Sequence, residues 1–288
     1  MTNSRKPPLK SQKPVADAPG ERIQKVLAHA GLASRREIEG WIGQGEVQIN
    51  GHIAKLGDRW HPGDFLTLRG RVVNVEKRLD AKTRVLVYHK PEGEMVTRRD
   101  PEGRPVVFSN LPRLDIGRWV AIGRLDINTQ GLLLVTNNGE LANRMMHPSQ
   151  QVEREYAVRV LGDVSDDTLK RLQDGVELED GKAHFNKLEF AGGEGANRWY
   201  HVTLTEGRNR IVRRLWESQR VAVSRLIRIR YGDTVLPPGL KARAHYELNE
   251  AERDALLVSA GLQPEAPVKI KRRPAPALKR GGRGSGAR

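Results

Sequence analysis

The first part of the chain alternates apolar and polar residues with two different periods. Residues 21–30 repeat apolar side chains at the spacing of one helical face, and Gly31 is expected to end this helix. Ser34 can cap a second short helix. Beyond it the pattern changes to strand-like alternation, in which Asn50 and Gly51 form a strong hairpin signal. The segment therefore predicts a small module of two helices and short strands.

After a charged connector at about residues 70–82, strand-like and helix-like patterns follow one another in no regular order. Strands are expected at residues 84–90, 131–136, 155–160, 199–204 and 221–231, and helices at residues 140–146, 165–172, 209–217 and from 249 onward. Strands with interspersed helices, but without regular βαβ alternation, are typical of the α+β class. We therefore predict an α+β protein with a small N-terminal domain and a larger second domain.

Positive charge is concentrated at the two ends of the chain. Of the formal net charge of +15, residues 1–20 carry +3 and residues 263–288 carry +7, which leaves +5 for the long middle. Both ends are rich in Pro, Gly and Ala and have few apolar residues to bury, so we expect disordered basic tails at 1–19 and 263–288. Such tails favour contact with nucleic-acid phosphates; the alternative is that they only aid solubility.

Several functional classes are disfavoured by what the sequence lacks. No uninterrupted apolar run is long enough to span a membrane, and the N-terminus has no apolar signal segment. The chain has no cysteine, which excludes disulfides and thiol chemistry and makes the cytoplasm the default location. It has no phosphate-binding loop, no dinucleotide fingerprint, no nucleophile elbow and no histidine–acid metal motif. Any chemistry must then come from side chains, and a carboxylate is the natural nucleophile.

One acid stands out at the junction of a polar loop and an aliphatic run. Asp126 follows Arg124 by two residues and precedes the run from Gly131 to Thr136. An acid at such a place is either a turn former, because its carboxylate bonds nearby N–H groups, or a catalyst held on a rigid element. Spacing alone favours the turn.

The N-terminal module resembles the S4 RNA-binding domain. The resemblance rests on Arg35 and Arg36 at a helix start and on the run 47–51, and it predicts an S4-like (αL) domain over residues 20–80. In S4 domains the helical pair and its adjoining loop present basic side chains to structured RNA. The resemblance therefore implies RNA contacts by a set of basic residues, namely Arg22, Lys25, Arg35, Arg36 and Lys55. The alternative is that these residues are the solvated face of a small amphipathic domain.

The larger domain resembles the pseudouridine synthases. Residues 123–126, followed by the run 131–137, look like their catalytic motif, and residues 139–149 are similar to the RsuA/RluB branch that acts on rRNA. Further segments match in the expected order at residues 90–93, 154–156, 206–217 and 223–232. The resemblance is greatest to the RluB-type enzymes of 23S rRNA. It implies a catalytic domain over 83–258, with a mixed or antiparallel sheet and flanking helices.

The resemblance also implies roles for five residues. Asp126 would be the nucleophile, and Arg213 would pair with it and keep it ionised. Tyr156 would stack on the uracil and relay a proton, Leu226 would wall the pocket, and Arg124 would fill the gap left by the extruded uridine. Without the resemblance, Arg213 is an exposed helix arginine, and Tyr156 and Leu226 are ordinary core residues.

Uridine isomerisation needs no cofactor or metal, because the leaving group and the acceptor are the same molecule. The resemblance implies 23S rRNA as partner, in a large-subunit precursor and near the peptidyl-transferase region, and a monomeric enzyme with no membrane contact. Asn128 and Thr129 would either shape the loop around the acid or make only ordinary turn hydrogen bonds. Ile211 stands where related helices carry a polar residue, and we expect this departure to adjust RNA contacts near the site.

Two other functions remain open. A non-catalytic RNA-binding or ribosome-assembly factor could use the same S4 domain and tails, although a binder has no need of Asp126. A carboxylate glycosidase would need a second acid paired with Asp126, and none is evident.

Overall fold

The computed structural model describes residues 20–265. The expected N-terminal tail and residues 266–288 lie outside this range. The described chain continues three residues into the segment 263–288 that we expected to be a tail. Glu265 Oε1 accepts a hydrogen bond of 2.9 Å from the Thr83 N–H, so this part is bound to the larger domain. In the described part of the chain, no helix is both long and apolar enough to cross a bilayer.

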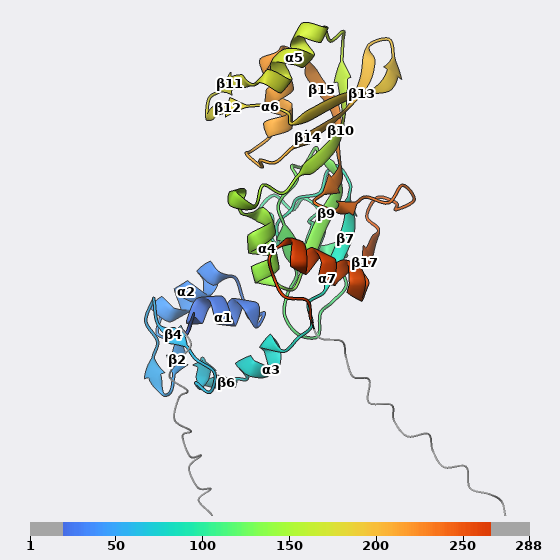
Figure 1. Cartoon of the computed structure of the whole chain (residues 1–288). Coiled ribbons are helices and arrows are strands. Elements are labelled where there is room, and N and C mark those ends of the chain that lie inside the picture. Colours follow the sequence, from blue (N-terminus) through green and yellow to red (C-terminus); the bar gives the residue numbers. More distant parts are fainter. Residues whose placement is uncertain (1–19, 266–288) are drawn as a thin grey trace, which may run out of the picture.

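The N-terminal domain has the helix pair and small sheet that the sequence predicts (Figure 1). Ser34 Oγ accepts a hydrogen bond of 3.1 Å from the Glu37 N–H and caps the second helix. The predicted helical face is completely buried. The elements are α1 (Ile23–His29), α2 (Arg35–Gly43), α3 (Val75–Leu79), a β1–β4 pair (Glu21–Arg22 and Arg59–Trp60), and a sheet in the order β3 (His52–Ile53), β2 (Val47–Ile49), β5 (Leu66–Leu68), β6 (Arg71–Val73).

Two local expectations for this domain were wrong. The first helix begins at Ile23 rather than at Glu21, because Glu21 pairs in extended conformation with Trp60. The segment 70–82 is not a plain connector, since it forms β6 and α3. Val75 of α3 is only 4% exposed and belongs to the apolar core of the N-terminal domain.

The larger domain is built on one nine-stranded sheet, which confirms the α+β prediction. The main strand order is β13-β14-β10-β15-β9-β7-β17, with β8 paired to β9 and β16 to β15. Only the β9–β15 pair is parallel, so the sheet is mixed. The strands are β7 (Val85–Lys90), β8 (Val120–Ile122), β9 (Gln130–Thr136), β10 (Arg154–Leu161), β13 (Lys187–Glu194), β14 (Asn197–Leu204), β15 (Ala222–Tyr231), β16 (Thr234–Val235) and β17 (His245–Glu247).

Helices cover both faces of this sheet. The helices α4 (Gly139–Met146) and α7 (Glu250–Ser259) lie beside its central strands, and α5 (Asp166–Asp174) and α6 (Ile211–Ser218) lie at its other end (Figure 1). A small β11–β12 hairpin (Val176–Leu178, Gly181–Ala183) and two 3₁₀ turns (Val107–Asn110, Pro148–Gln150) complete the described elements. The sequence did not predict β13, because most of its side chains are exposed and few are apolar.

Strand β9 is buried on both sides. Leu133 and Val135 belong to an apolar cluster with α6, while Leu132 and Leu134 belong to a second cluster with α4 and α7. Successive side chains of a strand point to opposite faces, so one aliphatic run serves both cores. The chain that enters β9 is therefore attached to the most rigid part of the domain.

The two domains touch through a backbone contact between two glycines. Gly31 follows α1 with a φ of +81° and lies against Gly117, whose φ is +88°. A Cβ added to Gly31 would lie 2.2 Å from the Gly117 Cα, which is far inside van der Waals contact. Lys25 Nζ also lies 3.3 Å from a carboxylate oxygen of Glu140, at the start of α4. A backbone contact and an ion pair thus join the domains.

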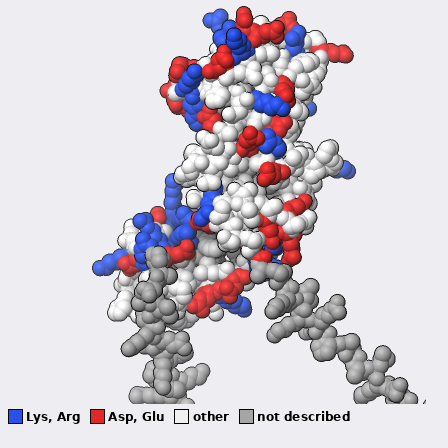
Figure 2. Space-filling view, in the orientation of Figure 1, with Lys and Arg blue, Asp and Glu red and all other residues white. Residues whose placement is uncertain are grey.

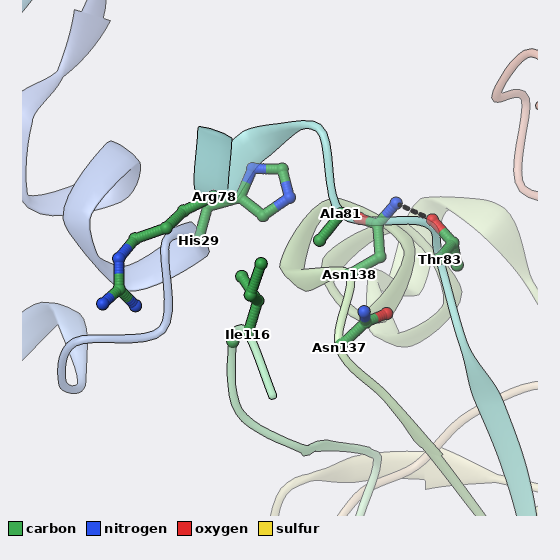
Figure 3. Close-up of a pocket in the computed structure, with 8 residues that line it drawn as sticks. His29, Arg78, Ala81, Thr83, Ile116, Asn137 and Asn138 are labelled. Atoms are coloured by element: carbon green, nitrogen blue, oxygen red, sulfur yellow. Dashed lines mark hydrogen bonds between the residues drawn. The ribbon is translucent and has the colours of Figure 1, made fainter. Parts of the chain in front are cut away.

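Polar side chains line a small pocket at the same junction (Figure 3). His29 and Arg78 approach it from the N-terminal side, and Asn137 and Asn138 from the start of α4. Asn138 Nδ2 donates to Thr83 Oγ1 at 2.9 Å, which ties the helix start to the chain entering the larger domain. None of the expected catalytic residues lines this pocket.

The glycine contact predicts that Gly31→Ala will separate the domains. The added methyl group cannot fit against Gly117, and small-angle X-ray scattering should show a larger radius of gyration. Gly51→Ala is the matched control, because Gly51 has a similar φ of +85° but open space around its missing Cβ. Both changes should cost about 1–2 kcal/mol from backbone strain. Equal scattering curves for the two variants would contradict the prediction.

Candidate active site

The loop that carries Asp126 is held by its backbone. The Thr129 N–H donates to the Asp126 carbonyl at 3.0 Å, which closes a turn. A turn is therefore present, but the backbone carbonyl forms it and not the carboxylate that the sequence had suggested. The carbonyl of Ile127 accepts from the Gly93 N–H at 2.9 Å. The carbonyl of Asn128 accepts from an Arg213 guanidinium N–H at 2.8 Å. The carbonyls of residues 126–128 therefore each have a partner.

Lys90 supplies the remaining bonds from the end of β7. Its side chain is completely buried, and its ammonium donates to the carbonyls of Asp126 at 3.0 Å and Thr129 at 2.9 Å. It also donates to the carbonyl of Pro91 at 3.0 Å and lies 3.4 Å from that of Ile127. Burial lowers the pKa of Lys90 to about 8, while the carboxylates of Glu94 and Asp126 act in the opposite direction.

Arg213 holds the loop rather than the carboxylate of Asp126. Its guanidinium donates to the carbonyls of Asn128 and Val223 at 2.8 and 3.0 Å, and its buried Nε has no partner. The expected ion pair is absent, since no acidic oxygen of residues 20–265 lies within 4 Å of Arg213. Burial lowers the pKa of Arg213, and the nearby Asp126 opposes this shift. Arg213 therefore positions Asp126 through the backbone of the loop.

The carboxylate of Asp126 is left without a hydrogen-bond partner among the described residues. It is half-buried, between the buried Leu125 and the more open side of the loop. Arg124 on the same loop is exposed, and within residues 20–265 it makes no hydrogen bond or ion pair. The chain thus fixes the backbone of Asp126, while its carboxylate oxygens have no hydrogen-bond partner among the described residues.

Tyr156 and Leu226 lie on neighbouring strands beside this loop. Tyr156 of β10 pairs with Arg228 of β15, which pairs in turn with Gly131 of β9. Two strand spacings, about 10 Å, therefore separate the backbones of Tyr156 and Gly131. Both Tyr156 and Leu226 are almost fully buried, at 8% and 4% exposed, in the cluster that includes Leu125.

Gly131 makes the parallel pairing of β9 and β15 possible. Its φ is +105°, and a Cβ at this position would lie 2.2 Å from the Arg228 carbonyl oxygen. Arg228 is itself only 2% exposed, and its Nε donates to the Leu132 carbonyl at 2.8 Å. The close approach brings the end of the Asp126 loop directly against β15.

The basic residues expected to contact RNA have different environments. Arg22, Arg35 and Arg36 are exposed, and no acidic oxygen in the described part of the chain lies within 4 Å of them. Lys55 is also exposed. Lys25 lies between Glu21 at 2.9 Å and Glu140 at 3.3 Å, so its charge is already neutralised in the domain contact. The three arginines therefore have no acidic partner among the described residues, whereas Lys25 takes part in the contact between the domains.

The sequence indicated Lys90 only as the first residue of the matched segment 90–93, and its bonds to the Asp126 loop were not predicted. The available signal was a charged residue that ends an apolar strand directly before Pro91.

The expectation that Ile211 adjusts RNA contacts was wrong, because its side chain is only 4% exposed and packs in the core. Thr129 is also buried, with an unpartnered hydroxyl, whereas Asn128 is exposed. Among residues 20–265 no cluster of metal-ligating side chains occurs.

Comparisons with known proteins identify the two domains. A family model described as RNA pseudouridylate synthase matches residues 84–218, and one described as S4 domain matches residues 21–66. A crystal structure of a pseudouridylate synthase has the same fold, with a TM-score of 0.57 and 24% identity over 82% of this chain and 99% of that one.

Curated relatives are much more similar in sequence. The ribosomal large subunit pseudouridine synthase B of Escherichia coli (strain K12) is 57% identical over 252 residues, which is 87% of each chain. The relative of the same name from Haemophilus influenzae is 55% identical over 88% of this chain and 71% of its own length. With this identity over most of its length, and with an S4 domain before the catalytic sheet, the chain belongs to the RNA pseudouridine synthase family.

Proposed function

We propose that this chain converts a uridine of large-subunit rRNA to pseudouridine, with the Asp126 carboxylate as the nucleophile. The observation that carries the proposal is the loop 126–129, whose backbone is fixed by Lys90 and Arg213 while the carboxylate stays unpaired. A nucleophile should be held in place without being occupied by other partners. The 57% identity to a large-subunit pseudouridine synthase supports the choice of RNA.

The proposed reaction is an isomerisation with no net gain or loss of electrons. Asp126 adds to the ribose C1′ or to the uracil C6, and the bond between C1′ and N1 breaks. The uracil turns within the pocket and its C5 forms a new bond to C1′. The bond between Asp126 and the nucleotide breaks, which restores the carboxylate, and the C5 proton is released. N1 takes up a proton, so atoms balance within the nucleotide.

The neighbouring side chains have complementary proposed roles. Tyr156 presents an aromatic ring for stacking on the uracil, and Leu226 forms an apolar wall on the adjacent strand. Arg124 is exposed and unpaired within the described residues, as required of a side chain that replaces an extruded base. A base inside a stem cannot be reached until it leaves the stack.

The proposed enzyme works as a single chain on 23S rRNA in the cytoplasm. Lys90, Asp126, Tyr156, Arg213 and Leu226 all come from the larger domain of one copy, so the site needs no second subunit. The S4 domain would contribute RNA contacts through the exposed arginines at its surface. A large-subunit precursor fits this arrangement, because the uridine must be accessible before the particle closes around it.

Asp126→Asn is expected to abolish pseudouridine formation without unfolding the protein. The amide has nearly the shape of the acid but is no nucleophile, and no hydrogen bond of the Asp126 side chain is lost among the described residues. Stability should change by less than about 0.5 kcal/mol. The product is measured by carbodiimide mapping of large-subunit rRNA incubated with each variant.

Asp115→Asn is the control for this experiment, because Asp115 is an exposed acid of the same domain that makes no hydrogen bond within residues 20–265. It should retain full activity. Pseudouridine formation by the Asp126→Asn protein would show that Asp126 is not the nucleophile. An unchanged map with the wild-type protein would instead support a non-catalytic RNA-binding factor.

From the lowered pKa of Lys90 we expect activity to fall as the pH rises, while the contribution of Lys90 to stability increases. Its pKa of about 8 means that raising the pH through 8 removes one donor from the loop, so kcat should fall with a midpoint near pH 8. Between about 8 and its usual value of 10.5, the folded protein has released a proton that the unfolded chain keeps. The contribution of Lys90 to the free energy of unfolding therefore rises with pH in this window.

Lys90→Met tests this assignment. It should lower kcat by about a hundredfold through loop displacement. It should also remove the alkaline fall in kcat near pH 8, whereas RNA binding should stay unchanged. A variant that keeps the wild-type pH profile would show that another group titrates there.

A further inference from the structure

A pair of arginines lies where the larger domain meets the S4 domain. Arg98 and Arg118 belong to the long segment between β7 and β8, which also contains Gly117. Because Gly117 contacts Gly31, this segment is held against the turn between α1 and α2. Neither arginine was among the RNA-binding residues expected from the sequence.

Arg98 is exposed as a whole residue, but its guanidinium is partly covered and held in a defined orientation. Its guanidinium donates to the Trp119 carbonyl and lies over the Phe108 ring, with its central carbon 4.6 Å from the ring centroid. A guanidinium fixed by a stack and a carbonyl bond keeps its other N–H groups directed outward. Less side-chain entropy is then lost when an anion binds.

Arg118 and Arg98 repel each other without a neutralising partner at contact distance. The pKa of each is lowered mainly by burial, and Arg118 lowers that of Arg98 further, whereas the more distant Glu37 raises both. Within residues 20–265, no acidic oxygen lies within 4 Å of either arginine. By contrast, Arg104 of the same segment is paired with Asp100 at 2.7 Å. Two unneutralised like charges cost free energy that a bound anion would recover.

The S4 domain continues this positive surface. Arg35 and Arg36 at the start of α2 are exposed and likewise have no acidic partner within 4 Å in the described part of the chain. Gly31, which contacts Gly117, precedes Arg35 by only four residues, so the start of α2 lies beside the segment that carries Arg118. Basic side chains gather over the N-terminal domain and its junction with the larger domain (Figure 2).

We propose that Arg98 and Arg118 form, with Arg35 and Arg36, one composite surface that binds consecutive backbone phosphates of an RNA stem across both domains. The surface is open and its arginines are spread over two domains, which suits an extended polyanion better than a small anion. The proposal rests on the proposed function only for the identity of the RNA.

The same surface leads towards the candidate active site. Arg118 precedes Arg124 by six residues, so at most about 20 Å of extended chain separates them. That distance corresponds to about six phosphates along one strand of a duplex. A stem bound at the junction would therefore extend to the loop that carries Asp126.

The test measures binding of the full chain to an RNA duplex of about 20 base pairs with an unrelated sequence. Arg98→Gln and Arg118→Gln should each weaken binding about tenfold at low salt, because one charge-assisted phosphate contact is lost. Each should also reduce the slope of log K against log salt by about 1. Arg118 makes no hydrogen bond within residues 20–265, so its variant tests the surface without removing a hydrogen bond of the folded protein.

Arg104→Gln is the matched control, since it removes the same charge from the same segment but from a side chain already paired with Asp100. It should bind within about twofold of the wild type. Equal affinities for the Arg98, Arg118 and Arg104 variants would overturn the proposal. A smaller slope of log K against log salt in Arg35→Gln, with unchanged slopes in the Arg98 and Arg118 variants, would also overturn the proposal. RNA binding would then be confined to the S4 domain.

A kinetic measurement separates this proposal from the proposed function. With large-subunit rRNA as substrate, Arg98→Gln and Arg118→Gln should raise KM and leave kcat unchanged. A wild-type protein that forms no pseudouridine would reject the proposed reaction, while the duplex-binding results would still decide on the phosphate surface.

Discussion

The bonds from the Lys90 ammonium to the backbone carbonyls around Asp126 are the constraint on which the candidate site depends. A buried ammonium is costly unless oxygen atoms surround it, and here the loop itself supplies those oxygens. The loop can therefore adopt only conformations that keep its carbonyls turned towards Lys90. Because these bonds use the backbone, the Asp126 carboxylate is fixed in place and still free to react. Arg213 adds one further bond of the same kind from α6.

The sheet turns this local constraint into a rigid site. Strand β9 supplies side chains to two cores at once, so the loop that enters it cannot shift without disturbing both. The parallel pairing of β9 with β15 then places Tyr156 and Leu226 on strands that flank the loop. The S4 domain has a core of its own and is joined to the larger domain by the contact at Gly117 and the ion pair between Lys25 and Glu140. The loop of Asp126 and the exposed arginines of the S4 domain are thus built on separate cores.

Features set by short-range patterns could be predicted from the sequence, and long-range contacts could not. The helical face that contains Ile23 and the buried run before Asn137 follow from periodicity, and Asp126 follows from its motif. The bond of Lys90 to the Asp126 carbonyl joins residues 36 positions apart, and that of Arg213 to Asn128 joins residues 85 apart. No periodicity encodes such contacts. The partner of Arg213 could not be predicted either. The family resemblance indicated the Asp126 carboxylate, whereas the structure shows a bond to the Asn128 carbonyl.

Gly131 also determines the length of the catalytic loop. The position that pairs with Arg228 must lack a side chain, because a Cβ there would lie 2.2 Å from a carbonyl oxygen. One residue inserted between Asp126 and Gly131 would bring Gln130 to that position, and one deleted would bring Leu132. The number of residues between Asp126 and the sheet is therefore fixed by a close approach of two backbones. The exposed Arg35 and Arg36 lie outside this stretch, so a new side chain at either position leaves the spacing intact.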